Sequence, residues 1–595
     1  MALKDQAARL FRSLTETRLI NGPERSAAAR LLCAAAIVGA VTFAVFLPAV
    51  NNGFVSWDDQ KNFLETTGYR GLGPQQMKWI WGDTGAGFYI PVTRLAMAVD
   101  YRLWGLTPGG HHFSGVLLHA CNATLLFLLN VALFRRFKAA GDRALLPAAA
   151  FAALFFALHP LRAEPAAWAS GLHDPLSTLF YLLTVLSYIR LRSGAGSRLK
   201  WTLASGLFFA LALLAKPAGL LLPLVLMLLD LHLFPAEGLK EKLRGAVRGK
   251  LHLLLLILPV AAVTLRSHQD VGSVYSFANY TALQRVTQAM YGGIFYLWKT
   301  LLPLGLSPLY QLDIQLQPWL WPYWLTTALF LGMTCIFIFL ARRGSLAGLT
   351  VWAAYLLLLA PVSGLAQTGY QAAADRYSYL TFLPWTLLLT GGALSVKKYR
   401  GPLLLAALAL LAALSLSTRR QLGVWHDSET LWRQAIAVEP DSTYALDNLG
   451  DALADSGKVR EAVPFYERAV IINPSFYEAH NDLATAYFET GRLEKAIKHF
   501  SLAVKIKPDY VLGHHNLANI CYFVTNQPEA AVFHYRKVTE LEPKNPVYQA
   551  ELGRALFRVR KFDAALRRFR IALELDPKNK LASAGKRETA RLLGQ

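Results

Sequence analysis

The chain has 595 residues, a formal net charge of +22 and 54% hydrophobic residues. A soluble domain covers itself with polar side chains and rarely sustains so apolar a composition, so a single soluble domain is excluded. The basic excess does not indicate a nucleic-acid partner, because 24 of the 35 basic residues before Arg419 lie in six short segments between apolar runs.

Apolar runs of helical length recur up to about residue 418 and predict a polytopic helical membrane domain over 29–418. Eleven such runs are candidate spans: 29–48, 113–134, 145–160, 175–190, 201–216, 218–234, 251–266, 322–341, 346–361, 378–395 and 402–418. The six basic segments alternate correctly between spans if the basic leader (1–28) is cytoplasmic: 1–30, 135–143, 190–200, 237–250, 341–345 and 397–400. The predicted outer loops are then 49–112, 161–174, 267–321 and 362–377.

One further segment, 285–302, is also apolar enough to cross a bilayer. We prefer a helix that lies at the outer interface, or a re-entrant pair, because a single crossing would place Arg342 and Arg343 outside. The choice sets the topology: eleven spans place the C-terminal part of the chain outside, whereas twelve place it in the cytoplasm.

The first outer loop carries an acidic pair, Asp58 and Asp59, just beyond the first span. Two close carboxylates raise the pKa of one of them, and an apolar edge adds desolvation, so the pair could hold a general base. The alternative is an exposed acidic turn or a helix cap.

A second polar cluster lies where the third span reaches the outer side, in LHPLRAEPAAWASGLHDPLS. It contains His159, Arg162, Glu164, His173 and Asp174. A metal-binding or sugar-binding edge is one interpretation, although the spacing matches no defined metal motif. The alternative is helix capping and interfacial anchoring of the side chains.

Two cations depart from the positive-inside pattern, Lys216 in LLAKPAGLLLP and Arg376 in AADRYSYL. An anionic lipid phosphate at the outer leaflet would need such groups, and arginine offers a bidentate fork. An ordinary ion pair, for instance between Arg376 and Asp375, is the alternative.

Three histidines stand at or near the start of the second span: His111, His112 and His119. His112 and His119 are seven residues apart and would share a helix face. We favour hydrogen-bonded interfacial histidines over a zinc site.

The C-terminal part contains four helix-pair repeats over 442–580. Pro440, Pro474, Pro508, Pro543 and Pro577 are spaced by 34, 34, 35 and 34 residues. The longer interval predicts a one-residue insertion near Asn526. In the first repeat, the characteristic small and aromatic positions are Leu449, Gly450, Leu453, Ala462, Tyr466 and Ala469. The pattern predicts a tetratricopeptide-repeat α-solenoid with a concave binding face, preceded by a connecting half repeat (419–441) and followed by a capping helix (581–595).

Taken in order, these stretches resemble the transmembrane and tetratricopeptide-repeat proteins, which are related to membrane protein O-mannosyltransferases of the GT-C class. The stretches that carry the resemblance are FVSWDDQKNF, YIPVTRLAMAVDYRLWGLTPGGHHFSGVLLHACNATLL, FALHPLRAEPAAWASGLHDPLS, AKPAGLLLPLVLMLLDL and ADRYSYL. The fold class predicted for the whole chain is therefore all-α: a GT-C-like domain of about eleven spans followed by the solenoid. The chain departs from the family at Thr93-Arg94-Leu95, where an arginine-proline pair is usual, at Pro217 and at His173.

The resemblance implies an enzyme that moves a sugar, such as mannose, from a polyprenyl-phosphate donor to a protein or envelope hydroxyl. It implies that Asp58 or Asp59 is the catalytic carboxylate and that Arg94, Lys216 and Arg376 lie near the lipid phosphate. His159 and Glu164 match the family's second-loop motif, and Asp174 belongs to the same predicted substrate-binding set.

The partners expected from this reasoning are the donor lipid, the membrane and a protein held by the repeats, with no nucleic acid. No cofactor is certain, and participation of a divalent metal is open. The expected location is a bacterial inner membrane with periplasmic repeats, with a eukaryotic endomembrane as the alternative. The rival function is a non-catalytic, membrane-anchored scaffold whose repeats organise an envelope assembly.

Overall fold

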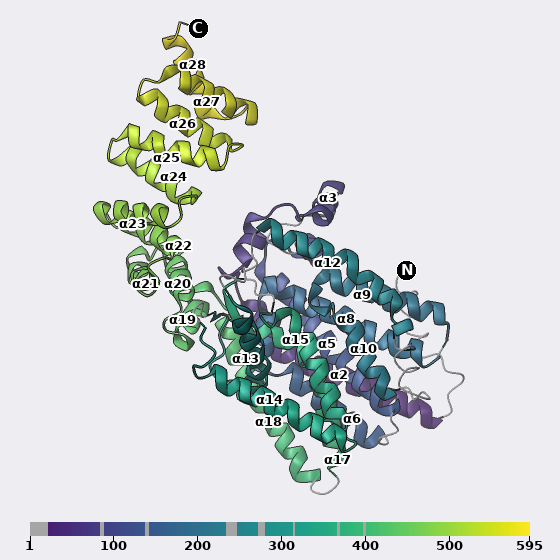
Figure 1. The fold of residues 1–595 in the computed structure, drawn as a ribbon. Coiled ribbons are helices and arrows are strands. Elements are labelled where there is room, and N and C mark those ends of the chain that lie inside the picture. Colours follow the sequence, from purple (N-terminus) through teal and green to yellow (C-terminus); the bar gives the residue numbers. More distant parts are fainter. Residues whose placement is uncertain are drawn as a thin grey trace. The chain divides into compact units, whose positions relative to one another are not determined.

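The computed structural model describes residues 22–83, 89–136, 142–194, 196–233, 245, 247–271, 280–312, 316–365, 369–396 and 400–594. Most of the predicted leader (1–21) and parts of three basic segments (137–141, 237–244 and 397–399) lie outside the described residues. The chain forms two compact units that divide between Gln434 and Ala435 (Figure 1). We call them the membrane unit and the repeat unit and describe each by itself.

The membrane unit is almost entirely helical, apart from a short antiparallel pair of strands, β1 with β2. Its first elements are α2 (Gly22–Phe46), η1 (Leu47–Asn51), η2 (Gln60–Glu65), α3 (Pro74–Gly82), α4 (Pro91–Trp104), α5 (Pro108–Arg136), α6 (Asp142–Ala157), η4 (Pro160–Arg162), α7 (Ala163–Ala167), η5 (Ala169–Leu172), α8 (His173–Arg192) and α9 (Arg198–Ala215). The next are η6 (Pro217–Gly219), α10 (Leu222–Leu233), α12 (Leu251–Val271), α13 (Ala282–Leu301), β1 (Tyr310–Gln311), α14 (Tyr323–Arg342), α15 (Ala347–Leu359), η7 (Ala360–Val362), β2 (Gln371–Ala373), η8 (Asp375–Tyr377), α16 (Ser378–Thr381), α17 (Trp385–Ser395), α18 (Arg400–Val424) and α19 (Ser428–Val438).

Each of the eleven predicted spans coincides with helical structure, although the run 378–395 is divided into α16 and α17. Among the described residues, five helices are long and apolar enough to cross a bilayer alone, and the bent pair of α6 with the segment Pro160–Ala167 makes a sixth crossing if it counts as one span. The five are Ser26–Asn51, Pro108–Arg136, Arg198–Ala215, Tyr323–Arg342 and Gly401–Val424. The remaining predicted spans include α8, which has 20 residues but is not among these five, and the shorter apolar helices Pro217–Leu231, Leu251–Ser267 and Ala347–Val362.

Helix α14 shows most directly which solvent surrounds this unit. It is strongly apolar, yet none of its residues is buried, and Leu329, Ile336 and Phe339 are exposed. A large exposed apolar surface of this kind is suited to hydrocarbon and not to water. The chain is therefore an integral membrane protein.

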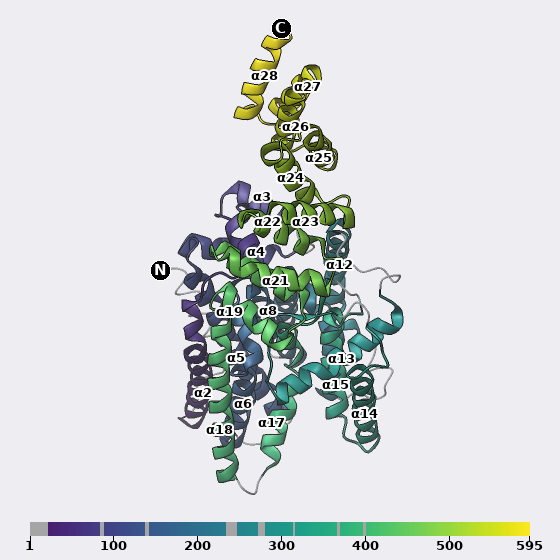
Figure 2. The ribbon, with the colours of Figure 1, turned by 90° about the vertical axis from the view of Figure 1, so that its left-hand side faces the viewer.

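The core of the membrane unit lies between α5, α6 and α8, where Phe127, Leu182 and Tyr188 are almost completely buried. Helices α2, α5, α6 and α18 pack beside one another, and Figure 2 shows them as a bundle. Together with the repeat unit, this arrangement confirms the predicted fold class of membrane helices followed by an α-solenoid.

Helix α13 corresponds to the ambiguous segment 285–302, and its contacts show how it is placed. Along its length it bonds to segments that connect the spans: Arg285 Nη1 to Leu365 O (3.3 Å), Gln288 Nε2 to Ala372 O (2.5 Å), Ala374 N to Tyr296 Oη (3.3 Å) and His159 Nε2 to Thr300 O (3.0 Å). These partners belong to the connections that the sequence predicts to be outer or, for His159, to the predicted outer end of a span. The contacts favour a helix that lies along one face of the unit over one that crosses it.

We call this face the loop face and define it by residues 47–66, 158–174, 216–219, 360–365 and 369–377. The long helix α18 ends there too. Asn52 Nδ2 donates to Leu422 O (3.1 Å), Gly53 N donates to His426 O (2.9 Å) and Ser56 N donates to Ser428 Oγ (2.8 Å). The chain therefore leaves the membrane unit at the loop face.

The repeat unit is a succession of paired helices (Figure 1). They are α20 (Thr443–Asp455), α21 (Val459–Ile472), α22 (Tyr477–Glu489), α23 (Leu493–Ile506), α24 (Val511–Asn519) with η9 (Ile520–Val524), α25 (Pro528–Leu541), α26 (Pro546–Arg558), α27 (Phe562–Leu575) and α28 (Lys580–Leu592). All of the small and aromatic positions that define the repeats are buried: Leu449, Gly450, Leu453, Ala462, Tyr466, Ala469, Leu483, Ala484, Tyr487, Ala496, Phe500, Ala503, Leu517, Ala518, Cys521, Ala531, Tyr535, Val538, Leu552, Gly553, Leu556, Ala565, Phe569 and Ala572.

Glycine at the small position lets the two helices of a repeat approach each other closely. A Cβ atom at Gly450 would lie 2.5 Å from the Tyr466 ring, and one at Gly553 would lie 2.7 Å from the Phe569 ring. The third repeat accommodates its extra residue where the sequence predicts it, because η9 is a π-helical turn and Asn526 follows with φ of 53°. Asparagine is among the residues that tolerate this left-handed conformation.

Histidines join the two helices within the second and third repeats. In the third, His514 Nε2 lies 3.1 Å from Pro508 O, and its Nδ1 lies 2.9 Å from Nδ1 of His534. Because a carbonyl only accepts, Nε2 of His514 carries the proton and its Nδ1 accepts from His534. The fourth repeat uses other residues for the same contacts: Gln549 donates to Pro543 O (2.8 Å) and accepts from Arg568 (3.1 Å).

This pair should make the third repeat sensitive to acid. Burial lowers the pKa of His514 and lowers that of His534 to about 4, from an ordinary value of 6.5. A histidine with a lowered pKa contributes stability that is present above pH 6.5 and is lost as the pH falls towards 4. We expect a loss on the order of 1 kcal/mol, since both rings are partly solvated and one pKa unit corresponds to about 1.4 kcal/mol.

Hydrogen exchange of the full-length protein at pH 7.5 and 5, corrected for the intrinsic exchange rate, measures this effect in peptides from α24 and α25. The double variant His514→Gln/His534→Arg copies the fourth repeat and should remove the difference. An equal acid-induced loss of protection in that variant would contradict the assignment.

Candidate functional site

The acidic pair in the first outer loop occupies two different environments. Asp59 is completely buried, and its carboxylate accepts hydrogen bonds from Val55 N (3.1 Å) and Ser170 N (2.8 Å). Asn62 Nδ2 also donates to Ser170 Oγ (3.0 Å). Asp59 therefore connects its own loop to the segment that follows α6. Burial raises the pKa of Asp59 to about 6, although the hydrogen bonds to its carboxylate oppose that rise.

Asp58 is exposed at the loop face, and among the described residues no group donates a hydrogen bond to its carboxylate. Protein surrounds this carboxylate on most sides, and the resulting loss of hydration raises its pKa above the ordinary value. Arg376, His173 and Lys61 lie close enough for their charges to oppose that rise. Asp58 is thus the member of the pair that a substrate can reach.

Next to Asp58, two ion pairs join four segments of the chain. In the first, Glu164 of α7 binds Arg376 of η8: it accepts from the guanidinium and also from Arg376 N (2.8 Å). Both side chains are largely buried. Gln371 Oε1 accepts from the other terminal nitrogen of Arg376 (2.7 Å). The alternative partner considered for Arg376, Asp375, accepts from the Tyr310 hydroxyl instead (3.0 Å).

In the second ion pair, Lys216 Nζ donates to Asp174 Oδ1 (2.6 Å). Lys216 lies at the junction of α9 and η6, and Asp174 lies at the start of α8. His173 Nε2 is 3.2 Å from the other oxygen of Asp174. We call Glu164, Arg376, Asp174 and Lys216 the ion-pair cluster.

Two aromatic side chains hold the cations of the cluster in place. The guanidinium carbon of Arg376 lies 5.4 Å from the Trp168 ring and 5.1 Å from the Tyr377 ring, and Lys216 Nζ lies 5.8 Å from the same tyrosine ring. The sequence did not single out Trp168, Tyr377 or Gln371. Trp168 lies within the second polar cluster and Tyr377 directly follows Arg376, so their nearness in sequence to predicted site residues could have pointed to them. No comparable sequence signal marks Gln371.

The structure does not bring two of the predicted site residues into this cluster. Arg94 pairs with Asp83 and stacks on the Trp79 ring at 4.8 Å. His159 is buried, and its ring accepts from Leu161 N (3.3 Å) while Nε2 bonds to Thr300 O. His159 therefore joins the end of α6 to α13.

The three histidines near the start of the second span are each bonded separately. Nε2 of His111 bonds to Gly105 O (3.0 Å), and Nε2 of His112 bonds to Gly53 O (3.1 Å). His119 is held by Tyr379 Oη (2.7 Å) and Ala157 O (3.0 Å). These contacts fit the interpretation of hydrogen-bonded histidines, since each ring is used to join backbone segments.

Comparison with known proteins identifies the repeats independently. A family model described as tetratricopeptide repeat matches residues 417–475, 448–511 and 550–590. Two solved structures are also similar to part of this chain. The crystal structure of MamA is 21% identical over 27% of this chain and 87% of its own, with a TM-score of 0.24. That of YrrB is 18% identical over 28% of this chain and 86% of its own, with a TM-score of 0.27.

Relatives whose similarity extends beyond the repeats agree with the resemblance found in the sequence. The human protein named Protein O-mannosyl-transferase TMTC4 is 27% identical in an alignment of 500 residues that covers 72% of this chain and 65% of the relative. The mouse TMTC4 protein is 26% identical with the same shares, and Protein O-mannosyl-transferase Tmtc1 of Drosophila melanogaster is 33% identical over 25% of this chain and 17% of its own. The chain thus spans 65% of the length of the TMTC4 relatives. These relatives confirm the resemblance to the transmembrane and tetratricopeptide-repeat proteins.

Proposed function

We propose that the protein is a membrane glycosyltransferase that moves mannose from a polyprenyl-phosphate donor to a hydroxyl group of a protein. The names of the relatives support a mannosyl transfer to oxygen. The observation that carries the proposal is the exposed Asp58 carboxylate beside Arg376, within a cluster that also holds Lys216. A free carboxylate and fixed cations are what proton removal and phosphate departure require.

In the proposed reaction, Asp58 takes the proton of the acceptor hydroxyl as that oxygen attacks the anomeric carbon. The bond from the anomeric carbon to the phosphate oxygen breaks with inversion, and the lipid phosphate leaves with the electron pair of that bond. No covalent enzyme intermediate is needed. Asp59 positions the loop that carries Asp58.

Arg376 and Lys216 would bind the leaving phosphate. Both cations keep hydrogen-bond donors for a phosphate while they are paired with Glu164 and Asp174, because arginine has five N–H donors and lysine has three. The carboxylates hold the two cations in position before the phosphate arrives, so little reorganisation is needed as negative charge develops. Arg94, which is paired elsewhere, has no part in this step.

The repeats would hold the protein acceptor or a partner and so raise its local concentration near the membrane. We also propose that the protein lies in the inner membrane of a bacterium, with the repeats on the periplasmic side. The odd number of spans favoured by the contacts of α13 supports an outer position for the segment that follows α18.

The donor class is tested by reconstituting the full chain in lipid nanodiscs and offering radiolabelled mannose as the polyprenyl-phosphate ester or as GDP-mannose. We expect transfer from the lipid alone. Lys216→Met should lower kcat/KM by about 10²-fold or more, as expected for loss of a group that stabilises the leaving phosphate.

A matched control is Lys250→Met. Lys250 is also a buried lysine bonded to an aspartate, Asp230, at 2.6 Å, and it lies in another part of the unit. This variant should transfer normally per folded molecule. Transfer from GDP-mannose alone, or an equal loss in both lysine variants, would contradict the proposed donor site.

A further inference from the structure

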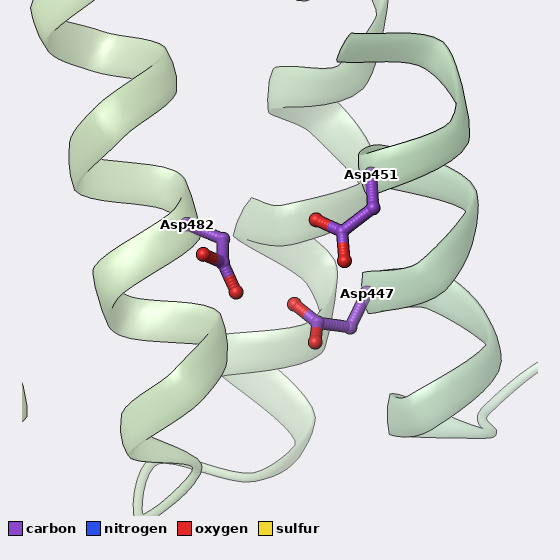
Figure 3. Close-up of side chains that lie close together, drawn as sticks. All are labelled: Asp447, Asp451 and Asp482. Carbon is purple, nitrogen blue, oxygen red and sulfur yellow. The ribbon is translucent and has the colours of Figure 1, made fainter. Parts of the chain in front are cut away.

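Three aspartates of the repeat unit converge although no part of the proposed transfer uses them. Asp447 and Asp451 lie four residues apart on α20 and so share a helix face, and Asp482 lies on α22 of the next repeat. Figure 3 shows the three side chains pointing towards one another across the space between the two helices. One oxygen from each lies within 4.8 Å of the others. We call these residues the aspartate triad.

The triad lacks a neutralising partner in the described part of the chain, where no lysine, arginine or histidine pairs with any of its members. Asp447 is only 7% exposed, its side chain points into the triad (Figure 3), and its Oδ1 has no hydrogen-bond partner. An unpartnered, buried carboxylate oxygen between two further carboxylates is costly unless a cation balances it.

The other two carboxylates are oriented by neighbouring side chains. The Tyr466 hydroxyl donates to Asp451 Oδ1 (2.7 Å), and Asn481 Nδ2 donates to Asp482 Oδ1 (3.1 Å). Asn516 Nδ2 in turn donates to Asn481 Oδ1 (2.9 Å). Such outer contacts are typical of built ligand sets, since they fix the direction of each carboxylate and leave its second oxygen free.

The donor set defines the cation. All three ligands are hard carboxylate oxygens, which select Ca²⁺ or Mg²⁺ over softer metals. Two oxygens bound to the same Ca²⁺ lie at most about 4.6–5.2 Å apart, twice the usual Ca–O distance. The three carboxylate oxygens lie within 4.8 Å of one another and so satisfy this limit. Asp451 and Asp482 are partly accessible, so water can complete the coordination.

We propose that Asp447, Asp451 and Asp482 form a binding site for a hard divalent cation, Ca²⁺ above all, which joins the first two repeats. The ion would bridge α20 and α22 and replace mutual repulsion of the carboxylates by attraction to a common centre. The site therefore stiffens the junction between these repeats when the ion is bound. It is independent of the proposed transfer of mannose.

The test uses chelator-treated, full-length protein in nanodiscs of neutral phosphatidylcholine, with CaCl₂ as the ligand. Calorimetric titration should show a site with a dissociation constant on the order of 10⁻⁴–10⁻³ M or tighter, as in other sites with few carboxylates. Hydrogen exchange of the same sample should slow in peptides from α20 and α22 when Ca²⁺ is added. Asp447→Asn and Asp482→Asn should each weaken binding at least tenfold.

The matched control is Asp563→Asn, which alters an exposed aspartate at the start of α27 and should bind Ca²⁺ as the wild type does. Exchange in α26 and α27 reports whether each variant is folded, and Asp451→Asn replaces any variant that is not. Absence of Ca²⁺ binding up to about 10 mM, ten times the weakest constant expected for such sites, would overturn the proposal. Unchanged affinity in the folded triad variants would also overturn it.

Discussion

Replacing Asp58 by asparagine should lower kcat/KM for mannosyl transfer by about 10²- to 10⁴-fold, the usual contribution of a general base, while the protein folds normally. The side chain is exposed and accepts no hydrogen bond from the described residues, so an amide of the same shape disturbs no contact there. Transfer from polyprenyl-phosphate mannose, measured beside thermal unfolding in nanodiscs, separates the two effects.

The neighbouring variant, Asp59→Asn, should behave in the opposite way. The NH₂ group of the new asparagine would face one of the backbone N–H groups that now donate to the carboxylate, Val55 N or Ser170 N. The two donors would then face each other inside a fully buried site. A loss of about 1–3 kcal/mol in the free energy of unfolding is expected for such an unsatisfied contact. If Asp58→Asn destabilised the protein while Asp59→Asn alone abolished turnover, the assignment of the two roles would be wrong.

The pH dependence of transfer gives a second measurement for the same residue. The base acts only when it is ionised, so the rate of the wild type should fall as the pH falls through the pKa of Asp58. Because reduced hydration raises that pKa above the ordinary carboxyl value, the acid limb should lie at a higher pH than an exposed aspartate would give. The residual activity of Asp58→Asn should lack this limb.

Replacing Glu164 by alanine should have the largest effect on stability, about 3–5 kcal/mol, because it leaves the guanidinium of Arg376 buried without its counter-charge. The backbone N–H of Arg376 loses its acceptor as well. Thermal unfolding of the variant in nanodiscs measures this loss. An exposed pair provides the control: Glu429→Gln removes the partner of Arg433 and should cost at most about 1 kcal/mol.

The double variant Glu164→Met/Arg376→Met distinguishes the energetic role of this ion pair from its chemical role. A buried ion pair replaced by apolar side chains of similar size is often as stable as the original. We expect the double variant to recover most of the stability that Glu164→Ala loses and to remain inactive, because Arg376 is needed at the phosphate. Recovery of transfer together with stability would show that the pair is structural only.

The sequence predicts those parts of the fold that depend on local patterns. Runs of about 20 apolar residues locate the membrane helices, since a bilayer imposes their length. Proline recurrence at intervals of 34 and 35 residues locates the repeats, and the longer interval locates the π-helical turn before Asn526. The division of the run 378–395 into two helices was not predicted.

The chemistry of the site depends on contacts between distant segments, and here the sequence is less informative. Asp58 and Asp59 are neighbours with the same side chain, and they are distinguished by the bonds that Asp59 accepts from nearby Val55 and from Ser170, 111 residues away. The sequence offered Asp375 as an alternative ion-pair partner for Arg376, but the partner in the structure, Glu164, is 212 residues away. The aspartate triad was not predicted either, although Asp447 and Asp451 share a helix face and the repeat spacing brings Asp482 opposite them.

The exposed apolar surface of helix α14 also affects how freely the sequence of this helix can vary. Its internal contacts involve few side chains, such as Thr334, which accepts from Trp352 Nε1 (3.1 Å), and Phe330 and Phe337, whose rings lie beside Trp352. Its exposed positions, such as Leu329, Ile336 and Phe339, face hydrocarbon, where shape complementarity is not required and any sufficiently apolar residue serves. We therefore expect exchange among leucine, isoleucine and phenylalanine at its exposed positions to be neutral, so that bilayer thickness constrains this helix more than any protein neighbour does.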